Sequence, residues 1–256
     1  MNWFRMRNRM AKNAGLFHVE IGECPEHSSQ SRVTRPIVHS DAPLTLVGGG
    51  VTGPGDLGES LALAPRLVAA DGGGDVALAA GYRPEAVIGD LDSLSAEARA
   101  TLGPAVHRIA EQETTDFDKA LRSIAAPVVI AVGMTGGRFD HDLAALNVLV
   151  RQAQRRCVLL GSESLVFLTP PEVRLPLAAG ETVSLFPMGP CRARGEGLFW
   201  PLDGLELTPW GRVATSNSAT GPVTIRVDAP RLLVILGRGR LREVVETLSG
   251  PGPRWD

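Results

Sequence analysis

The chain has 256 residues, of which 44% are hydrophobic and 21% charged, a balance typical of a globular protein with a sizeable core. Its formal net charge of −2 argues against the basic surface needed to bind nucleic acid or an anionic membrane. No apolar run approaches the roughly 20 residues of a membrane-spanning helix, and none follows the basic N-terminus as in a signal peptide. The three cysteines form no CxxC pair, so we expect a cytoplasmic protein without disulfides.

The first half of the chain has the pattern of a parallel sheet covered by helices. Residues 1–40 are expected to be an N-terminal extension. From residue 41, short apolar runs that end in glycine or aspartate alternate with amphipathic segments. The expected strands are 43–50, 65–71, 85–93, 105–110 and 127–137, and the expected helices are 56–64, 75–84, 96–103, 114–125 and 139–154. Ser93 and either Thr114 or Thr115 are expected to cap the third and fourth of these helices.

The pattern changes near Cys157, where short β-rich runs separated by Gly and Pro replace the helices. The expected runs are 157–170, 181–189, 193–202, 213–218 and 222–236. We therefore predict an α/β domain over residues 41–158, an all-β sandwich domain over 159–245 and a tail over 246–256, with a short helix from 242 leading into the tail.

The stretch "VIGDLDS", residues 87–93, places Asp90 and Asp92 two residues apart at the end of a predicted strand. Paired carboxylates repel each other unless a cation or a proton lies between them. Ligands of open parallel sheets bind beyond the carboxyl ends of the strands, and the notable residues all fall there. They are Gly48–Gly50, Asp71–Gly74, Gly89–Ser93, Thr114–Asp116 and Thr135–His141.

These residue types favour metal-nucleotide chemistry. Mg²⁺ prefers oxygen ligands, which Asp90, Asp92 and Asp116 would supply, with Asp71 as a further candidate. Arg138 and His141 would donate to polyphosphate oxygens. Each residue also has an ordinary interpretation, as a tight turn, an Asx turn or a helix cap, but all of these would have to apply at one end of one sheet. Neither clustered His and Cys ligands for zinc nor a GxSxG elbow occurs.

Four blocks, in this order and spacing, resemble the thiamine pyrophosphokinase family: "AADGGGDVAL", "PEAVIGDLDSL", "EQETTDFDKAL" and "GMTGGRFDHDLAALNVL". The segment "FWPLDGLELTPWGRVATSNS" is similar to the W-x-L, glycine and S-N segment of that family. The resemblance covers about residues 41–240. It implies an α/β domain followed by a β-sandwich, a homodimer, and transfer of the pyrophosphoryl group of ATP to the hydroxyl of thiamine with Mg²⁺, giving thiamine diphosphate and AMP.

The resemblance also implies roles for individual residues. Those implied for catalysis are Asp71, Asp90, Asp92, Asp116 and Arg138, with Asp90, Asp92 and Asp116 as metal ligands. Those implied for ATP are Gly73, Gln112, Thr115, Thr135, Asp140 and His141. Those implied for thiamine, near the subunit interface, are Trp200, Ser216 and Asn217. Which aspartate accepts the proton of the alcohol stays open.

Two departures from the family pattern bear on the acceptor. Glu111 and Glu113 replace aspartates, and Ser218 follows Ser216-Asn217 where an acid is common. Two alternatives therefore remain: a diphosphokinase of another primary alcohol, such as a hydroxymethylpterin, and a non-catalytic sensor of a nucleotide or of thiamine diphosphate. Several uncompensated acids in one cleft argue against the sensor.

Overall fold

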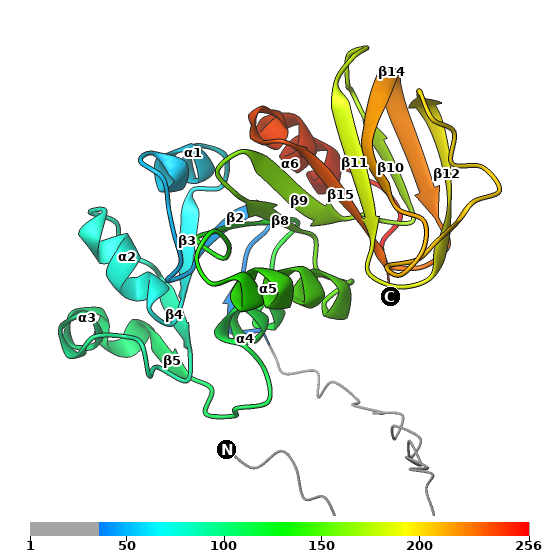
Figure 1. The fold of residues 1–256 in the computed structure, drawn as a ribbon. Coiled ribbons are helices and arrows are strands. Elements are labelled where there is room, and N and C mark those ends of the chain that lie inside the picture. Colours follow the sequence, from blue (N-terminus) through cyan, green and yellow to red (C-terminus); the bar gives the residue numbers. More distant parts are fainter. Residues whose placement is uncertain (1–35, 256) are drawn as a thin grey trace, which may run out of the picture. The chain divides into compact units, whose positions relative to one another are not determined.

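A computed structural model describes residues 36–255 (Figure 1). Its first half is built around a buried strand, β2. β2 pairs in parallel with β7, and β7 pairs in parallel with β8. On its other side β2 lies next to β3, and β3, β4 and β5 form a parallel set. The bounds are β2 Leu44–Val47, β3 Arg66–Ala70, β4 Ala86–Gly89, β5 Val106–Arg108, β7 Val129–Val132 and β8 Cys157–Leu160. The chain thus leaves β2 toward β3 and later returns to its opposite side at β7.

Helices cover both faces of this sheet because alternate strand residues point to opposite faces. In β3, Leu67 and Ala69 pack in one hydrophobic cluster with residues of α1, α2 and α3, whereas Val68 and Ala70 pack in another with residues of α4 and α5. The helices span α1 Asp56–Leu63, α2 Gly73–Ala79, α3 Ala96–Leu102, α4 Asp116–Arg122 and α5 Phe139–Arg151. None of the helices within residues 36–255 has the length and apolarity needed to cross a membrane.

The helix caps confirm one prediction and correct another. Thr115 caps α4 by accepting a hydrogen bond from the Asp118 amide, as predicted. Ser95 caps α3 by accepting from the Ala98 amide, so the prediction of Ser93 was wrong. The chain needs two more residues to turn from β4 into α3.

The helix α4 ends at Arg122, earlier than predicted, because β6 (Ile124–Ala125) pairs with an unpredicted strand, β1 (Val38–His39).

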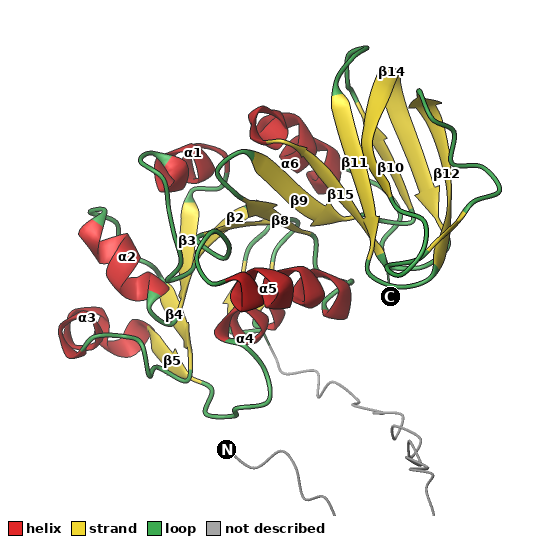
Figure 2. Cartoon of the chain, in the orientation of Figure 1, coloured by secondary structure: helices red, strands yellow, loops and turns green. Residues whose placement is uncertain are grey.

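The second half is largely β, and it continues the same sheet (Figure 2). From β8 the hydrogen-bonded order runs β9, β15, β11, β14, β12 and β13, and β10 also pairs with β14. The bounds are β9 Ser164–Leu168, β10 Glu172–Leu175, β11 Thr182–Pro187, β12 Cys191–Leu198, β13 Glu206–Leu207, β14 Ala214–Val227 and β15 Leu232–Gly237. The predicted fold class, a parallel α/β part followed by a largely β part, is confirmed.

Several details of the β part differ from the prediction. β10 and the two-residue β13 were not predicted, and β14 is one strand of 14 residues where the sequence indicated separate runs. The predicted domain boundary, between residues 158 and 159, falls inside β8, which pairs with β7 on one edge and β9 on the other. A closing helix, α6 (Leu241–Ser249), packs on β10 through Leu241, Val244, Val245 and Leu248.

An ion pair joins the beginning of α1 to the end of β15. Arg238 donates to Asp56 Oδ1 at 2.9 Å and also pairs with Glu59. Its other nitrogen donates to the backbone oxygens of Gly161 and Ser162, which follow β8. Asp56 Oδ2 in turn accepts a hydrogen bond of 2.7 Å from the Gly53 amide. This network fixes the loop between β2 and α1.

Gly73, at the first turn of α2, provides a test of the packing. A Cβ at this position would lie 2.1 Å from the Val47 carbonyl oxygen, so any side chain would push α2 away from β2. We expect Gly73→Ala to lower the free energy of unfolding by about 2 to 3 kcal/mol. Gly58→Ala is the matched control, because its Cβ would meet only Tyr82 Oη at 3.7 Å, and it should be neutral or slightly stabilising. Urea unfolding measures both, and equal effects would contradict this packing.

Candidate active site

A cavity of about 760 Å³ opens at the carboxyl ends of the strands around β2. Its lining comes from the loops after β2, β3, β4 and β7 and from the first turns of α4 and α5. This is the point where the strand order reverses, where open α/β sheets bind their ligands. All of the lining residues lie between 48 and 145, within the predicted α/β domain. The cavity therefore lies at the edge of the sheet where the sequence predicts a ligand site.

Glycines let the loops after β2 and β7 approach each other closely. A Cβ at either Gly48 or Gly50 would lie 2.6 Å from the Gly133 carbonyl oxygen, and Gly133 itself has a φ of +68°. No side chain fits between these two backbones. Backbone therefore forms part of the cavity lining, exposed at Gly49 and Gly50, which suits the close approach of a phosphate group.

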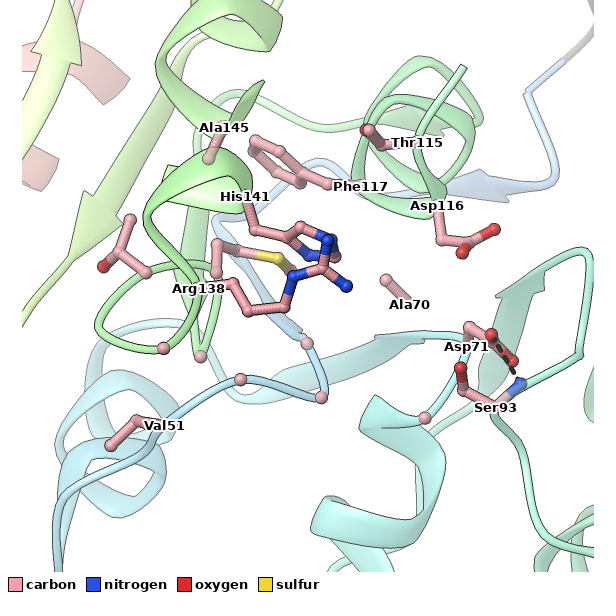
Figure 3. Close-up of a pocket in the computed structure, with 18 of the residues that line it drawn as sticks. Val51, Ala70, Asp71, Ser93, Thr115, Asp116, Phe117, Arg138, His141 and Ala145 are labelled. Carbon is pink, nitrogen blue, oxygen red and sulfur yellow. Dashed lines mark hydrogen bonds between the residues drawn. The ribbon is translucent and has the colours of Figure 1, made fainter. Parts of the chain in front are cut away.

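Basic and acidic side chains lie on opposite sides of the cavity. Figure 3 shows Arg138 and His141 side by side at the start of α5, with Asp71 and Asp116 across from them. Arg138 is 72% exposed at its side chain and donates two hydrogen bonds to Asp140, of 3.1 and 2.6 Å. Asp140 therefore orients Arg138 and does not itself line the cavity. This arrangement leaves the guanidinium accessible to an anionic ligand.

Two threonines and an unpredicted aspartate complete this wall. Thr115 and Thr135, both predicted as nucleotide-binding residues, line the cavity. Asp142 was missed by the sequence analysis. Its Oδ1 accepts a hydrogen bond of 3.0 Å from the Gly136 amide, which holds the loop after β7 against α5. Its place in the first turn of α5, five residues after Gly137, was the available signal.

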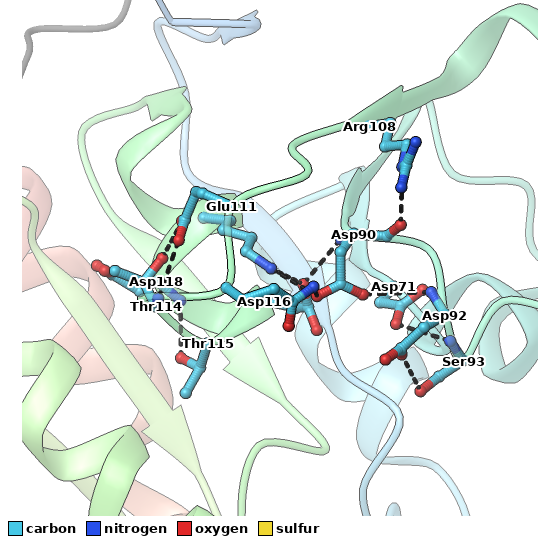
Figure 4. Close-up of polar contacts among 12 residues, drawn as sticks. Asp71, Asp90, Asp92, Ser93, Arg108, Glu111, Thr114, Thr115, Asp116 and Asp118 are labelled. Atoms are coloured by element: carbon cyan, nitrogen blue, oxygen red, sulfur yellow. Dashed lines mark hydrogen bonds and ion pairs between the residues drawn. The ribbon is translucent and has the colours of Figure 1, made fainter. Parts of the chain in front are cut away.

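Three carboxylates form a compact group beside the cavity. One oxygen from each of Asp71, Asp90 and Asp92 lies within 4.8 Å of the others (Figure 4). Asp71 is buried. Its Oδ2 accepts from the Ser93 amide at 3.0 Å, whereas its Oδ1 has no partner within residues 36–255. A buried oxygen without a donor beside two further carboxylates is a ligand set that suits a hard cation such as Mg²⁺.

Burial raises the pKa of Asp71 to about 6, although the Ser93 amide lowers it, and the neighbouring Asp116 and Asp92 add to the rise. The backbone here is unusual as well. Asp71 has a φ of +42° and Leu91, between Asp90 and Asp92, a φ of +69°. Such conformations cost free energy for residues other than glycine. The chain is therefore held so that these carboxylates converge.

Lys119 is the central residue that the sequence analysis missed. Its ammonium lies 2.7 Å from Asp90 Oδ2 and 2.9 Å from Asp116 Oδ1, and its side chain is only 1% exposed. The hydrogen bond from Lys119 lowers the pKa of Asp90, against the effect of burial. The pKa of Lys119 is raised, because its bonds to Asp90 and Asp116 outweigh desolvation. The i, i+3 spacing from Asp116 was the signal in the sequence.

The structure places the other predicted acidic and neighbouring residues as follows. Gln112 donates to Asp90 Oδ2 at 3.0 Å and so belongs to the group. Gly73 packs against β2 and does not line the cavity. Of the predicted metal ligands Asp90, Asp92 and Asp116, the first two converge with Asp71, whereas Asp116 lies outside this group.

Two acidic side chains near α4 point away from the cavity. Asp118 is buried and accepts a hydrogen bond from Gln152. Glu111 accepts from Thr114 and Arg122. Burial opposes ionisation of Glu111, but these bonds prevail and lower its pKa to about 2. The glutamate side chain at position 111 therefore stabilises the loop before α4.

The residues predicted for thiamine lie together in the β part. The buried Asn217 side chain accepts from the Trp200 amide at 3.1 Å and donates to the Trp200 carbonyl oxygen at 2.8 Å. Ser216 precedes it with a φ of +58°. The Trp200 side chain is left 56% exposed, edge-on to Phe199 with ring centroids 4.9 Å apart. These residues do not line the cavity, and Figure 1 shows β12 and β14 well away from α2 and β3.

Comparison with protein families identifies the class. The model described as thiamin pyrophosphokinase, catalytic domain, matches residues 58–160, and that described as thiamin pyrophosphokinase, vitamin B1 binding domain, matches residues 171–232. The chain belongs to the thiamin pyrophosphokinase family. It is 32% identical to thiamine pyrophosphokinase 1 of rice over 53% of this chain and 59% of the rice protein. It is 31% identical to thiamine pyrophosphokinase 1 of Arabidopsis thaliana over 60% of this chain and 66% of that protein.

Solved structures agree on the fold. The thiamin pyrophosphokinase of Geobacillus thermodenitrificans superimposes with a TM-score of 0.62 at 25% identity, covering 76% of this chain and 97% of that one. The yeast thiamin pyrophosphokinase gives a TM-score of 0.61 at 16% identity, over 85% of this chain and 95% of the yeast chain, and at that identity shows the fold alone. This chain spans about three fifths to two thirds of the length of the rice and Arabidopsis relatives.

The pKa of Asp71 predicts how stability depends on pH. The pKa of Asp71 is 3.8 in the unfolded state and about 6 in the folded state, so the folded state binds the proton more tightly. The stability that this proton contributes is therefore lost as pH rises from about 4 to about 6. We expect metal-free Asp71→Asn to exceed the wild type by up to about 3 kcal/mol near pH 7.5 and to match it near pH 4. Urea unfolding in EDTA measures this, and a difference that does not change with pH would contradict it.

Proposed function

We propose that this chain is a thiamine pyrophosphokinase that transfers the pyrophosphoryl group of ATP to the hydroxyl of thiamine, giving thiamine diphosphate and AMP, with Mg²⁺. The observation that carries the proposal is the placement of an acidic group opposite Arg138 and His141 in one glycine-lined cavity. Family membership supports the same reaction. Phosphoryl transfer depends on positioning and on neutralising charge, and this cavity offers groups for both.

The nucleotide and the metal would use different parts of the cavity. The Arg138 guanidinium would hold the polyphosphate, together with those loop amides that do not already donate within the fold, as the Gly48 and Gly50 amides do. Asp71, Asp90 and Asp92 would hold Mg²⁺, which when bound supplies positive charge to the phosphate oxygens. Asp116 lines the cavity outside that group, so its carboxylate is available to accept the proton of the attacking hydroxyl.

The acceptor would bind on the β part. The exposed face of Trp200 suits a cationic aromatic ring such as that of thiamine. The Asn217 side chain holds the Trp200 backbone by donating a hydrogen bond to its carbonyl oxygen. Because these residues are remote from the cavity within one chain, a second copy would have to bring its Trp200 to the cavity. We therefore propose a homodimer with the thiamine site near the subunit interface. The cytoplasmic location remains a prediction.

The product assay decides among the acceptors. Purified chain is incubated with ATP and Mg²⁺ alone, with thiamine, and with a hydroxymethylpterin, and AMP is measured. AMP that appears only with thiamine supports the proposal. AMP that appears only with the pterin would favour the alternative diphosphokinase, which the departure at Ser218 keeps open. Nucleotide binding without AMP formation in any mixture would favour a sensor.

Substitution of Asp92 tests the metal role. We expect Asp92→Asn to lower kcat on the order of 100-fold or more, because the site loses one negative ligand for the cation. The circular dichroism spectrum should be unchanged, since Asp92 is exposed. Asp203→Asn removes the same charge from an exposed position in the β part and should retain full activity. Wild-type turnover by Asp92→Asn would rule out its role as a ligand.

Substitution of Trp200 tests the acceptor site. Loss of a cation–π contact of about 1.4 kcal/mol corresponds to a tenfold weaker interaction, so Trp200→Ala should raise KM for thiamine about tenfold and leave KM for ATP nearly unchanged. Trp210→Ala serves as the control, because Trp210 is another exposed tryptophan of the same segment. An unchanged KM for thiamine in Trp200→Ala would assign the ring to another role.

A further inference from the structure

Lys119 occupies the space between two carboxylates that come from different elements. Asp90 follows β4, and Asp116 begins α4. The ammonium contacts one oxygen of each, at 2.7 and 2.9 Å. Both of these oxygens also accept a second hydrogen bond, Asp116 Oδ1 from the Asp90 amide and Asp90 Oδ2 from Gln112. These two oxygens are therefore fully engaged by protein donors.

A divalent cation could bind between Asp90 and Asp116 only by displacing that ammonium. Lys119 has no room to move away, because its side chain is 1% exposed and lies in the core of the α4 face. A displaced ammonium would stay buried without a partner, which is costly, and would repel the incoming ion at close range. The lysine therefore excludes a second cation from this place.

The cluster has a second possible cation position, which no Lys or Arg side chain of residues 36–255 occupies. There, Asp71, Asp90 and Asp92 each offer an oxygen within a 4.8 Å group. Asp71 is 3% exposed, and its Oδ1 has no donor among the described residues. Within that part of the chain, this is the oxygen of the cluster most in need of a positive partner. The two places share Asp90.

We propose that Lys119 acts as a built-in cation of the site, which limits the nucleotide-free chain to one divalent ion, held by Asp71, Asp90 and Asp92. Asp116 is then a partner of Lys119 and not a ligand of that ion. Any further metal ion used in turnover enters with the phosphates of the nucleotide. The inference rests on the proposed metal-dependent function and specifies its metal count.

Metal counting tests the inference with a readout other than activity. Mn²⁺ is titrated into the nucleotide-free full chain, and free Mn²⁺ is followed by electron paramagnetic resonance. We expect one bound ion per wild-type chain and two per Lys119→Met chain, because methionine keeps much of the length of the side chain without its charge. Arg122→Met is the charge-matched control, since Arg122 lies on the same helix but pairs with Glu111 and Asp118, and it should bind one ion.

Two results would overturn the inference: a wild-type chain that binds two ions, and a folded Lys119→Met chain that still binds one. If Lys119→Met does not fold, two aspartate variants decide. Asp71→Asn should weaken Mn²⁺ binding at least tenfold, whereas Asp116→Asn should change it less than threefold. Equal losses in the two variants would make Asp116 a ligand and contradict the inference.

The product assay on the wild type keeps this test separate from that of the function. A chain that makes thiamine diphosphate but binds two ions in the absence of nucleotide would retain the proposed function and lose the inference. If the wild type binds one ion and Lys119→Met binds two, but the wild type transfers nothing to thiamine, the inference stands and the proposed function is wrong.

Discussion

The site depends on one electrostatic constraint, the repulsion among carboxylates that three segments bring to one edge of the sheet. Asp71 follows β3, Asp90 and Asp92 follow β4, and Asp116 begins α4. Lys119 offsets part of this repulsion from within the core, and the Ser93 amide offsets another part at Asp71. What remains is a net negative charge of the group Asp71, Asp90 and Asp92, which a bound cation would neutralise.

A second constraint, close backbone packing, explains why this edge is hollow. Gly73 brings α2 against the end of β2, and Gly48 and Gly50 bring the loop after β2 against Gly133. Side chains at these positions would separate the elements and fill the cavity. Arg238 supports the same loop from β15 through Asp56. These glycines thus allow close packing of the backbone. That packing in turn leaves backbone amides at this edge accessible to an anion.

The sequence predicted the parallel sheet and the position of the site because both follow from a local pattern, apolar runs that end in Gly or Asp. It did not predict Lys119, because a lysine beside an aspartate is usually exposed, and only the packing of α4 on the sheet shows that this one is buried. Nor did it predict β10 or the split of the last β-rich run, because strands of four residues with Pro nearby carry little periodicity. That Asp71, and not Asp116, groups with Asp90 and Asp92 depends on distances between elements, which no spacing along the chain encodes.

In the proposed homodimer, the cavity of one chain and the Trp200 segment of the other form one site. The most direct test mixes the Asp92→Asn chain with the Trp200→Ala chain under conditions that exchange subunits, at a thiamine concentration where each alone is nearly inactive. A mixed dimer has one site with intact Asp92 from one chain and intact Trp200 from the other. We expect activity to appear on mixing, toward about a quarter of the wild-type value if exchange is random. A mixture no more active than its components would contradict a site shared between two chains.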